Sequence, residues 1–260
     1  MDALLTYDSV EISFGGAAVV RDMSFSLHSG EILGLVGESG SGKSTIIKAA
    51  MGLLGNSGLV TRGDIWFEGK NLPDLPEKEM RRIRGGKIGM IFQDAGASLC
   101  PIRTIGEQIF ESMTAHRQIT KTEAKDAALS LFAKLRFKDG ERIWNSYPFE
   151  LSGGMNQRAG IAISVLMNPS VLFADEPTSA LDVAVQRQVV DELLELRELF
   201  GTAIILVTHD IGVVSAMADS VLVLQQGNKM EYGRARDVLD HPQNSYTRKL
   251  LSAVPKLRRA

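Results

Sequence analysis

The stretch Gly37-Glu38-Ser39-Gly40-Ser41-Gly42-Lys43-Ser44-Thr45 decides the fold, because it matches the phosphate-loop pattern G-x-x-x-x-G-K-[ST]. The apolar run Ile32–Val36 before it predicts a buried strand, and Ser44–Leu54 predicts the helix that follows. Glycines let consecutive backbone N–H groups point at a phosphate, and the helix N-terminus adds a partial positive charge. We expect the Lys43 ammonium to contact the β- and γ-phosphates of a nucleotide. The Ser44 hydroxyl is a hard oxygen ligand for Mg²⁺.

The composition is that of an ordinary globular protein. The 260 residues are 44% hydrophobic and 23% charged, which suffices to build a sizeable core. A net charge of −2 gives no overall basic field for nucleic acid. The single cysteine, Cys100, excludes an internal disulfide and a cysteine-based cluster. We expect no signal peptide at Met1–Asp8 and no membrane helix, since no apolar run approaches about 18 residues. Any membrane function is therefore expected to require partners.

Strand and helix patterns alternate along most of the chain. Val171–Ala174 and Ala203–Val207 are continuous apolar runs typical of buried strands, and a helical face lies between them. A hairpin is predicted within Val221–Tyr232. This alternation predicts a parallel sheet covered on both faces. The region at about 94–153 differs, because helical spacing and a capping box at Thr120–Glu123 predict an inserted helical subdomain there.

Polar side chains follow the ends of these strands. Asp175 and Glu176 come directly after Val171–Ala174, and His209 follows Ala203–Val207 by two residues. Ligands of open parallel sheets bind at the carboxyl ends of the strands. We therefore expect Asp175 to hold Mg²⁺ through water, Glu176 to polarise an attacking water and His209 to contact the γ-phosphate. Taken alone, a histidine at a strand end is more often structural.

Two further segments complete the predicted site. Gln93 follows the apolar run Ile88–Phe92 and can bind Mg²⁺ through its amide oxygen, an assignment that rests on its order in the chain. In Leu151–Met155, Ser152 is a good N-cap, and the glycines after it leave helix-terminal N–H groups bare. This predicts a second anion site. Because the chain already has one phosphate loop, the second site suits the nucleotide of a neighbouring subunit.

These residues, in this order, resemble the nucleotide-binding subunits of ABC transporters over about residues 5–255. The resemblance implies ATP and Mg²⁺ as cofactors and catalytic roles for Glu176, His209 and Gln93. Ser179-Ala180-Leu181-Asp182 is similar to the D-loop, and Phe14 to the aromatic that stacks on adenine, with core packing as its alternative. The residues expected to contact nucleotide are Phe14, Gly37, Glu38, Ser39, Gly40, Ser41, Gly42, Lys43, Ser44, Thr45, Ser152, Gly153, Gly154 and Asp182. Those expected to hold Mg²⁺ are Ser44, Gln93 and Asp175.

Within this family the chain is most similar to the importer subunits for dipeptides, oligopeptides and nickel. That similarity lies in Arg103–Gln108, in Tyr147–Met155, and in His241-Pro242 followed by Tyr246–Pro255. It implies a P-loop (RecA-like) α/β core with an antiparallel β portion and an inserted helical subdomain. The nucleotide-binding domain is expected over residues 1–235 and a C-terminal extension over 236–260. The solute stays open between peptides and nickel complexes.

The resemblance also implies partners. We expect a second ABC ATPase subunit (a paralogue or a copy), two transmembrane permease subunits and an extracytoplasmic solute-binding protein, with this chain peripheral at the cytoplasmic face of the cell membrane. The alternative is a non-transport ABC ATPase that acts on nucleic acid or ribosomes. It would predict a long coiled-coil insertion, a second cassette or a basic face, and the sequence has none of these. A GTPase or small-molecule kinase would leave Leu151–Gly154 and His209 unexplained.

Overall fold

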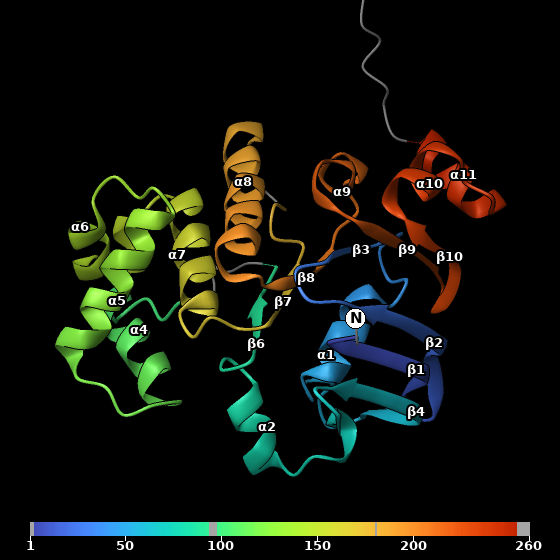
Figure 1. Cartoon of the computed structure of the whole chain (residues 1–260), viewed down its shortest axis with the longest axis horizontal. Helices are drawn as coiled ribbons and strands as arrows, with labels where there is room; N and C mark the ends of the chain where they lie inside the picture. The colour runs from blue at the N-terminus through green and yellow to red at the C-terminus, as the bar shows by residue number, and fades with distance from the viewer. Residues whose placement is uncertain (1–2, 94–97, 180, 254–260) are drawn as a thin grey trace, which may run out of the picture. The chain divides into compact units, whose positions relative to one another are not determined.

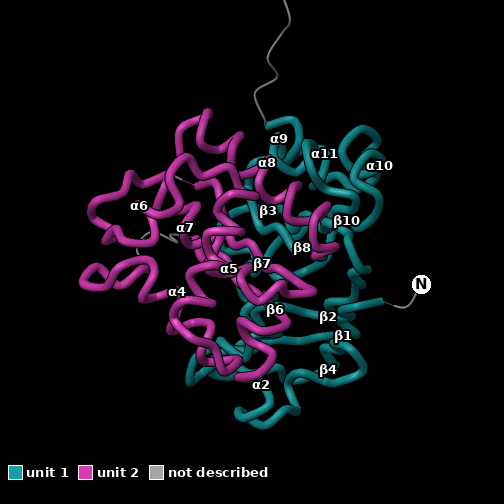
Figure 2. Tube along the Cα trace, turned by 60° about the vertical axis from the view of Figure 1, so that its left-hand side comes forward, with its two compact units in different colours: residues 1–80, 203–260 teal, residues 81–202 magenta. Residues whose placement is uncertain are grey.

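The computed structural model describes residues 3–93, 98–179 and 181–253 (Figure 1). The chain forms two compact units: unit 1 comprises residues 1–80 and 203–260, and unit 2 comprises residues 81–202 (Figure 2). The start of the predicted helical segment (94–97), Ala180 and the tail from residue 254 lie outside the described residues. None of the described helices has both the length and the hydropathy that a membrane span requires.

A parallel ribbon forms the centre of unit 1. Strand β3 (Ile32–Gly37) pairs in parallel with β8 (Ala203–Val207) on one side and with β9 (Ser220–Gln225) on the other. Strand β10 (Asn228–Arg234) is antiparallel to β9. Every residue of β3 and β8 is buried, which explains why both appear in the sequence as uninterrupted apolar runs. The predicted strands β3, β8 and β9 are confirmed to within one residue, whereas β10 extends two residues beyond the predicted end of the hairpin at Tyr232.

An antiparallel sheet of four strands completes the β-structure of unit 1. Its order is β2 (Ala17–Leu27), β1 (Leu5–Phe14), β4 (Gly58–Phe67) and β5 (Lys70–Asn71). Tyr7 of β1 stacks on Phe25 of β2, with 4.4 Å between ring centroids. The Tyr7 hydroxyl donates to the carbonyl of Ile46, 2.9 Å away, and so ties the sheet to the helix that follows the phosphate loop.

Four α-helices of unit 1 pack against these strands among the described residues. Helix α1 (Lys43–Ala50) was expected to reach Leu54 but ends four residues earlier, where Gly52 adopts a left-handed φ of +61°. Helix α9 (Ile211–Met217) follows β8, and α10 (Ala235–Asp240) and α11 (Ser245–Ser252) lie beside β10 (Figure 1). A short turn, η1 (Leu72–Asp74), and α2 (Glu77–Ile83) lead from β5 toward unit 2. The division into residues 1–235 and an extension over 236–260 stays a prediction.

Unit 2 contains the parallel pair β6 (Ile88–Ile91) and β7 (Val171–Asp175) together with most of the helices. Helices α4, α5 and α6 pack against one another within the segment predicted to be helical (Figure 1). The capping box predicted at Thr120 is present, and the helix predicted to start after Ser152 does so. The helical elements are α4 (Ile105–Thr114), α5 (Lys121–Lys134), α6 (Gly140–Asn145), η2 (Pro148–Glu150), α7 (Gly153–Val165) and α8 (Val183–Phe200).

Candidate functional site

The phosphate loop of unit 1 connects β3 to α1 through residues that only glycine fits well. Gly37 has a φ of +154°, and a Cβ placed there would lie 2.3 Å from the carbonyl oxygen of Leu224. Gly42 forms the N-cap of α1 with a φ of +100°. The loop therefore keeps its backbone close to the sheet and turns into the helix without a side chain in the way. This is the geometry that the G-x-x-x-x-G-K-[ST] pattern predicts.

The polar groups of this loop point inward. Lys43 is only 5% exposed, and its Nζ donates to the carbonyl oxygens of Gly37 and Glu38, each 2.8 Å away. The Ser41 hydroxyl is buried and has no hydrogen-bond partner among the described residues. A buried hydroxyl without a partner costs free energy unless a bound group satisfies it. A phosphate oxygen would accept from Ser41, so the loop fits the anion that its sequence predicts. Ser39, Gly40, Ser44 and Thr45 lie in the same loop and first turn.

His209 lies at the same sheet edge as the loop. Strands β3 and β8 are parallel with Leu35 opposite Val207, and the backbone N–H of Thr208 donates to Leu35 at 3.3 Å. The exposed His209 then follows β8, just as Gly37 ends β3. The structure thus brings together the two strand-end positions of unit 1 that the sequence selected.

Gln93 and Glu176 meet in unit 2. The Gln93 Nε2 donates to Oε2 of Glu176 at 3.2 Å, and the Ser179 hydroxyl contacts the carbonyl oxygens of both, at 3.3 and 3.0 Å. Glu176 has a left-handed φ of +48°, which is costly for a residue other than glycine. Asp175 is 5% exposed at the end of β7. Sequence reasoning placed Ser179 in the D-loop but missed this bridging role, although its spacing of three residues from Glu176 suits a turn.

The Ser152–Gly154 segment begins helix α7. The Ser152 hydroxyl accepts from the backbone N–H of Met155 at 3.3 Å, as an N-cap does. A Cβ on Gly153 would meet nothing within 4 Å, whereas one on Gly154 would lie 2.9 Å from Cγ1 of Val185 in α8. The two glycines therefore differ: Gly153 borders open space, and Gly154 packs against the same chain.

Asp182 and Phe14 have local partners that the sequence did not show. The carboxylate of Asp182 accepts from the backbone N–H groups of Ala184 and Val185, each at 3.0 Å, and so caps α8. Phe14 ends β1 half-buried, and a Cβ on the neighbouring Gly58 would lie 2.7 Å from its ring. The contacts of both residues with nucleotide stay predictions.

A buried ion pair links α7, the helix that begins at the Ser152–Gly154 segment, to α8. Arg158 of α7 donates from Nε to Glu192 of α8 and from Nη2 to the carbonyl of Leu135, 2.6 Å away. Its guanidinium lies 4.1 Å from the ring centroid of Phe137. Burial raises the pKa of Glu192 to about 7, although Arg158 favours the charged form. Arg158 thus joins α7 to α8 and to the end of α5, a link that the sequence analysis missed.

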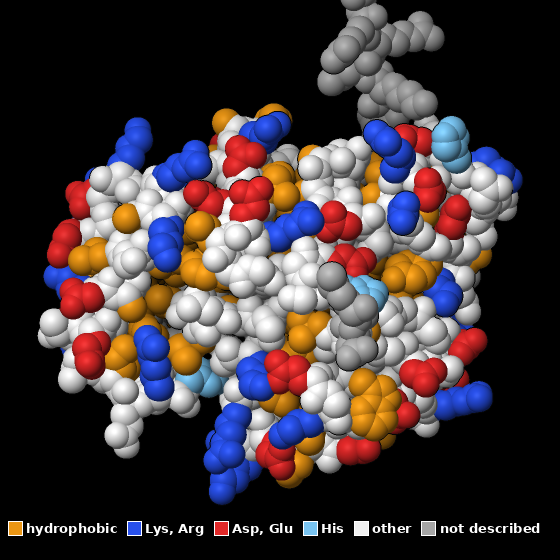
Figure 3. Space-filling model, in the orientation of Figure 1, with side chains coloured by type: hydrophobic (Ala, Val, Ile, Leu, Met, Phe, Trp, Pro, Cys, Tyr) orange, Lys and Arg blue, Asp and Glu red, His pale blue; other side chains and the backbone are white. Residues whose placement is uncertain are grey.

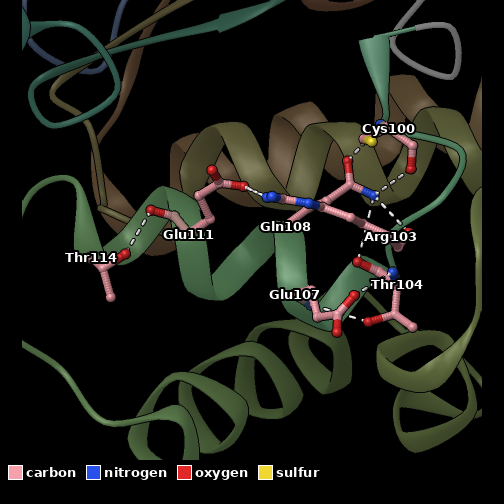
Figure 4. A network of polar contacts seen from close by, with 7 residues as sticks. All are labelled: Cys100, Arg103, Thr104, Glu107, Gln108, Glu111 and Thr114. Atoms are coloured by element: carbon pink, nitrogen blue, oxygen red, sulfur yellow. Dashed lines mark hydrogen bonds and ion pairs between the residues drawn. The ribbon is translucent and has the colours of Figure 1, made fainter.

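A second polar network fixes the loop before α4 (Figure 4). The Gln108 side chain accepts from the backbone N–H of Cys100 at 2.8 Å and donates to the carbonyls of Cys100 and Arg103, each at 3.1 Å. Arg103 also pairs with Glu111. Between these anchors Ile102 is 82% exposed, so the loop presents an apolar side chain on a fixed backbone.

Charge is mixed on the face shown in Figure 3, where Lys and Arg side chains are interspersed with Asp and Glu. On that face the described residues form no continuous basic surface. A basic patch or stripe is the usual electrostatic footprint of a nucleic-acid-binding face.

Comparison with known proteins agrees with this geometry. Residues 20–179 match the family model described as ABC transporter. The chain is 44% identical to the oligopeptide transport ATP-binding protein OppD of Salmonella typhimurium, covering 98% of this chain and 77% of that one. It is 42% identical to the dipeptide transport ATP-binding protein DppD of Bacillus subtilis, covering 99% and 78%. A dimeric ATP-binding cassette, solved in a post-hydrolysis state with ADP and Pi, is similar with a TM-score of 0.77 at 28% identity, covering 89% and 99%.

Proposed function

Since this chain belongs to the ABC transporter family and binds and hydrolyses ATP for transport, we propose that its transporter imports peptides. The observation that carries the proposal is the phosphate loop with its inward Lys43, in a chain whose relatives carry oligopeptide and dipeptide transport in their names. Those names favour peptides over nickel complexes as the solute. The alternative of an ABC ATPase acting on nucleic acid has no support among these relatives.

In the proposed ATP site, the phosphate loop binds the phosphates of the nucleotide. Lys43 and the backbone N–H groups of residues 37–45 hold the phosphates, and Ser41 supplies a hydroxyl that has no partner among the residues that the structure describes. Ser44, Asp175 and Gln93 offer hydroxyl, carboxylate and amide oxygens, the hard donors that suit Mg²⁺. When bound with ATP, Mg²⁺ neutralises charge that develops on the phosphates. Phe14 stacks on the adenine in this proposal.

Hydrolysis is assigned to Glu176, His209 and Gln93. Glu176 accepts a proton from a water that attacks the γ-phosphorus, the bond from phosphorus to the β,γ-bridging oxygen breaks, and ADP and phosphate leave. Gln93 already donates to Glu176 and so fixes where its carboxylate points. His209 contacts the γ-phosphate and orients the attacking water. In this proposal Ser152, Gly153, Gly154 and Asp182 act on the nucleotide of a second subunit.

The proposed assembly follows from the transporter function. The chain works with a second ABC ATPase subunit, two permease subunits and an extracytoplasmic solute-binding protein, and lies peripherally at the cytoplasmic face of the membrane. The family match supports this proposal, because solute must cross the membrane through another part of an ABC transporter. The exposed Ile102, on the loop held by Gln108, is suited to contact a permease.

Titration with MgATP tests the nucleotide site. Lys43→Ala should abolish tight binding, because it removes a charge-assisted contact to the phosphates. Lys48→Ala is the matched control, since Lys48 is the other lysine of α1 and lies in its last turn. Unchanged affinity in Lys43→Ala would remove this residue from the site. For the solute, uptake of a labelled dipeptide and of nickel should be compared in cells with and without the gene, and loss of nickel uptake alone would contradict the peptide proposal.

A further inference from the structure

Helix α11, labelled in Figure 1, is anchored to β10 by the two residues that precede it. The carboxylate of Glu231 in β10 accepts from the backbone N–H groups of Gln243 and Asn244, at 2.8 and 3.1 Å. Asn244 then caps the helix, because its Oδ1 accepts from the backbone N–H of Tyr246 at 2.8 Å. These bonds fix the backbone from which the Tyr246 side chain projects.

Tyr246 reaches from this helix to the phosphate loop. It is 8% exposed, and its hydroxyl oxygen accepts from the backbone N–H of Glu38 at 3.4 Å across a separation of 208 residues. Burial raises the pKa of the Tyr246 phenol, so the hydroxyl stays neutral and keeps its proton. The C-terminal helix therefore contacts the loop expected to hold ATP.

Tyr246 contacts the peptide unit that joins Gly37 to Glu38. The N–H of Glu38 and the carbonyl of Gly37 belong to the same planar peptide, and no peptide bond in the described chain is cis. That carbonyl accepts from Lys43 Nζ at 2.8 Å. In a trans peptide the N–H and C=O point in opposite directions, so Tyr246 holds one side of the peptide and Lys43 the other.

We propose that Tyr246 is a positioning residue for ATP binding, which fixes the Gly37–Glu38 peptide and through it the Lys43 ammonium. This inference rests on the proposed function, because it requires that the loop bind ATP. A loop that is already ordered loses less conformational freedom when ligand binds. Without the hydroxyl, the peptide is held on one side only, so its orientation and the position of Lys43 are less well fixed. The effect falls on affinity, because Tyr246 contacts the loop backbone and takes no part in the chemistry.

Tyr246→Phe in the full chain tests the proposal, because it removes only the hydroxyl. The dissociation constant and the KM for ATP should each rise severalfold, up to the about tenfold that one neutral hydrogen bond can supply, because this bond is also present without nucleotide, while kcat stays within about twofold. Tyr232→Phe is the matched control, since the Tyr232 hydroxyl donates to the carbonyl of Ser26 in β2, away from the loop. The control should bind ATP as the wild type does, with a similar melting temperature for both variants.

A second variant tests the attachment of α11 to β10 while the Tyr246 hydroxyl is kept. Glu231→Ala removes the acceptor that holds the start of α11 and keeps Tyr246, and it should also raise the KM for ATP without changing kcat. Wild-type affinity in Tyr246→Phe, or a loss confined to kcat, overturns the positioning role. If Lys43→Ala binds ATP normally, Lys43 is not part of the ATP site, and the premise of the inference fails. If Lys43→Ala loses binding and Tyr246→Phe does not, only the inference about Tyr246 fails.

Discussion

A carboxylate placed at Gly153 tests whether the Ser152–Gly154 segment binds a nucleotide held by a second subunit. Gly153 is the first residue of α7, and a Cβ there meets nothing within 4 Å. At Gly154 the new Cβ would lie 2.9 Å from Val185, so Gly154→Asp would disturb packing inside the chain. Gly153→Asp is therefore the substitution that changes charge with little change in the fold.

The added carboxylate should have opposite effects on the free energy of the isolated subunit and of the closed dimer. At the first turn of a helix a carboxylate is favourable by about 0.3–1 kcal/mol, so the isolated subunit should lose no stability. Two unit charges about 5 Å apart repel by about 3 kcal/mol at an effective dielectric constant of about 20, which is about a hundredfold in an equilibrium constant. The neighbour's γ-phosphate would meet this repulsion only when the dimer closes around ATP.

The assay compares the subunit alone with the assembled transporter. We expect Gly153→Asp to bind ATP as the wild type does when monomeric, to fail to form ATP-dependent dimers by size-exclusion chromatography, and to lose ATPase activity in the transporter. Gly153→Asn, of similar size but uncharged, should lose much less. Loss of ATP binding by a monomer that is folded by circular dichroism would place the segment at its own chain's nucleotide. Full ATPase activity of the assembled variant would refute the shared site altogether.

Two further substitutions test the hydrolytic carboxylate and the buried ion pair. Glu176→Gln should keep ATP binding and stall turnover, because the amide keeps its size but cannot accept a proton; wild-type phosphate release would move this role to another residue. Glu192 has a pKa raised by burial to about 7 from an ordinary 4.5, so the folded state binds more protons than the unfolded state between those values. Stability should therefore fall, by no more than about 3 kcal/mol, as pH rises from about 5 to 7. Glu192→Gln should flatten this slope in urea unfolding measured across that range, and an unchanged slope would show that another group causes it.

The elements that the sequence predicted best are those whose signal is local. Strand β8 is confirmed with the bounds predicted from its apolar run. Because both faces of this strand are buried, the run contains no polar residue and its two ends are clear in the sequence. Ser152 marks the start of α7 for a similar reason, since an N-cap acts within three residues. The end of α1 was placed too late, because apolar residues continue to Leu54 whereas Gly52 had already taken a left-handed conformation. The pairing of β1 with β2 and β4 was not predicted from the sequence, since strand pairing and its register depend on residues that can lie far apart in the chain.

The same distinction separates the predicted site residues from those that were missed. Lys43 and Ser44 belong to a contiguous motif, so their positions could be predicted from nine residues. The contact between Tyr246 and Glu38 spans 208 residues, and that between Arg158 and Glu192 spans 34. No local pattern encodes either contact, because each depends on how packed elements place two side chains.

The conformation of Glu176 explains how two adjacent carboxylates can have separate roles. Successive side chains of a strand point to opposite faces, so continuing β7 would fix the direction of Glu176 by the pleat alone. Instead β7 ends at Asp175, and the left-handed φ of +48° at Glu176 breaks the alternation. Such a conformation costs about 1–2 kcal/mol and persists only where neighbours hold it. Gln93 donates to the carboxylate of Glu176, and the Ser179 hydroxyl donates to its carbonyl. Asp175 therefore stays in the sheet, whereas hydrogen bonds fix the direction of the Glu176 side chain. Gln93 is thereby both a candidate ligand and the group that directs the candidate base.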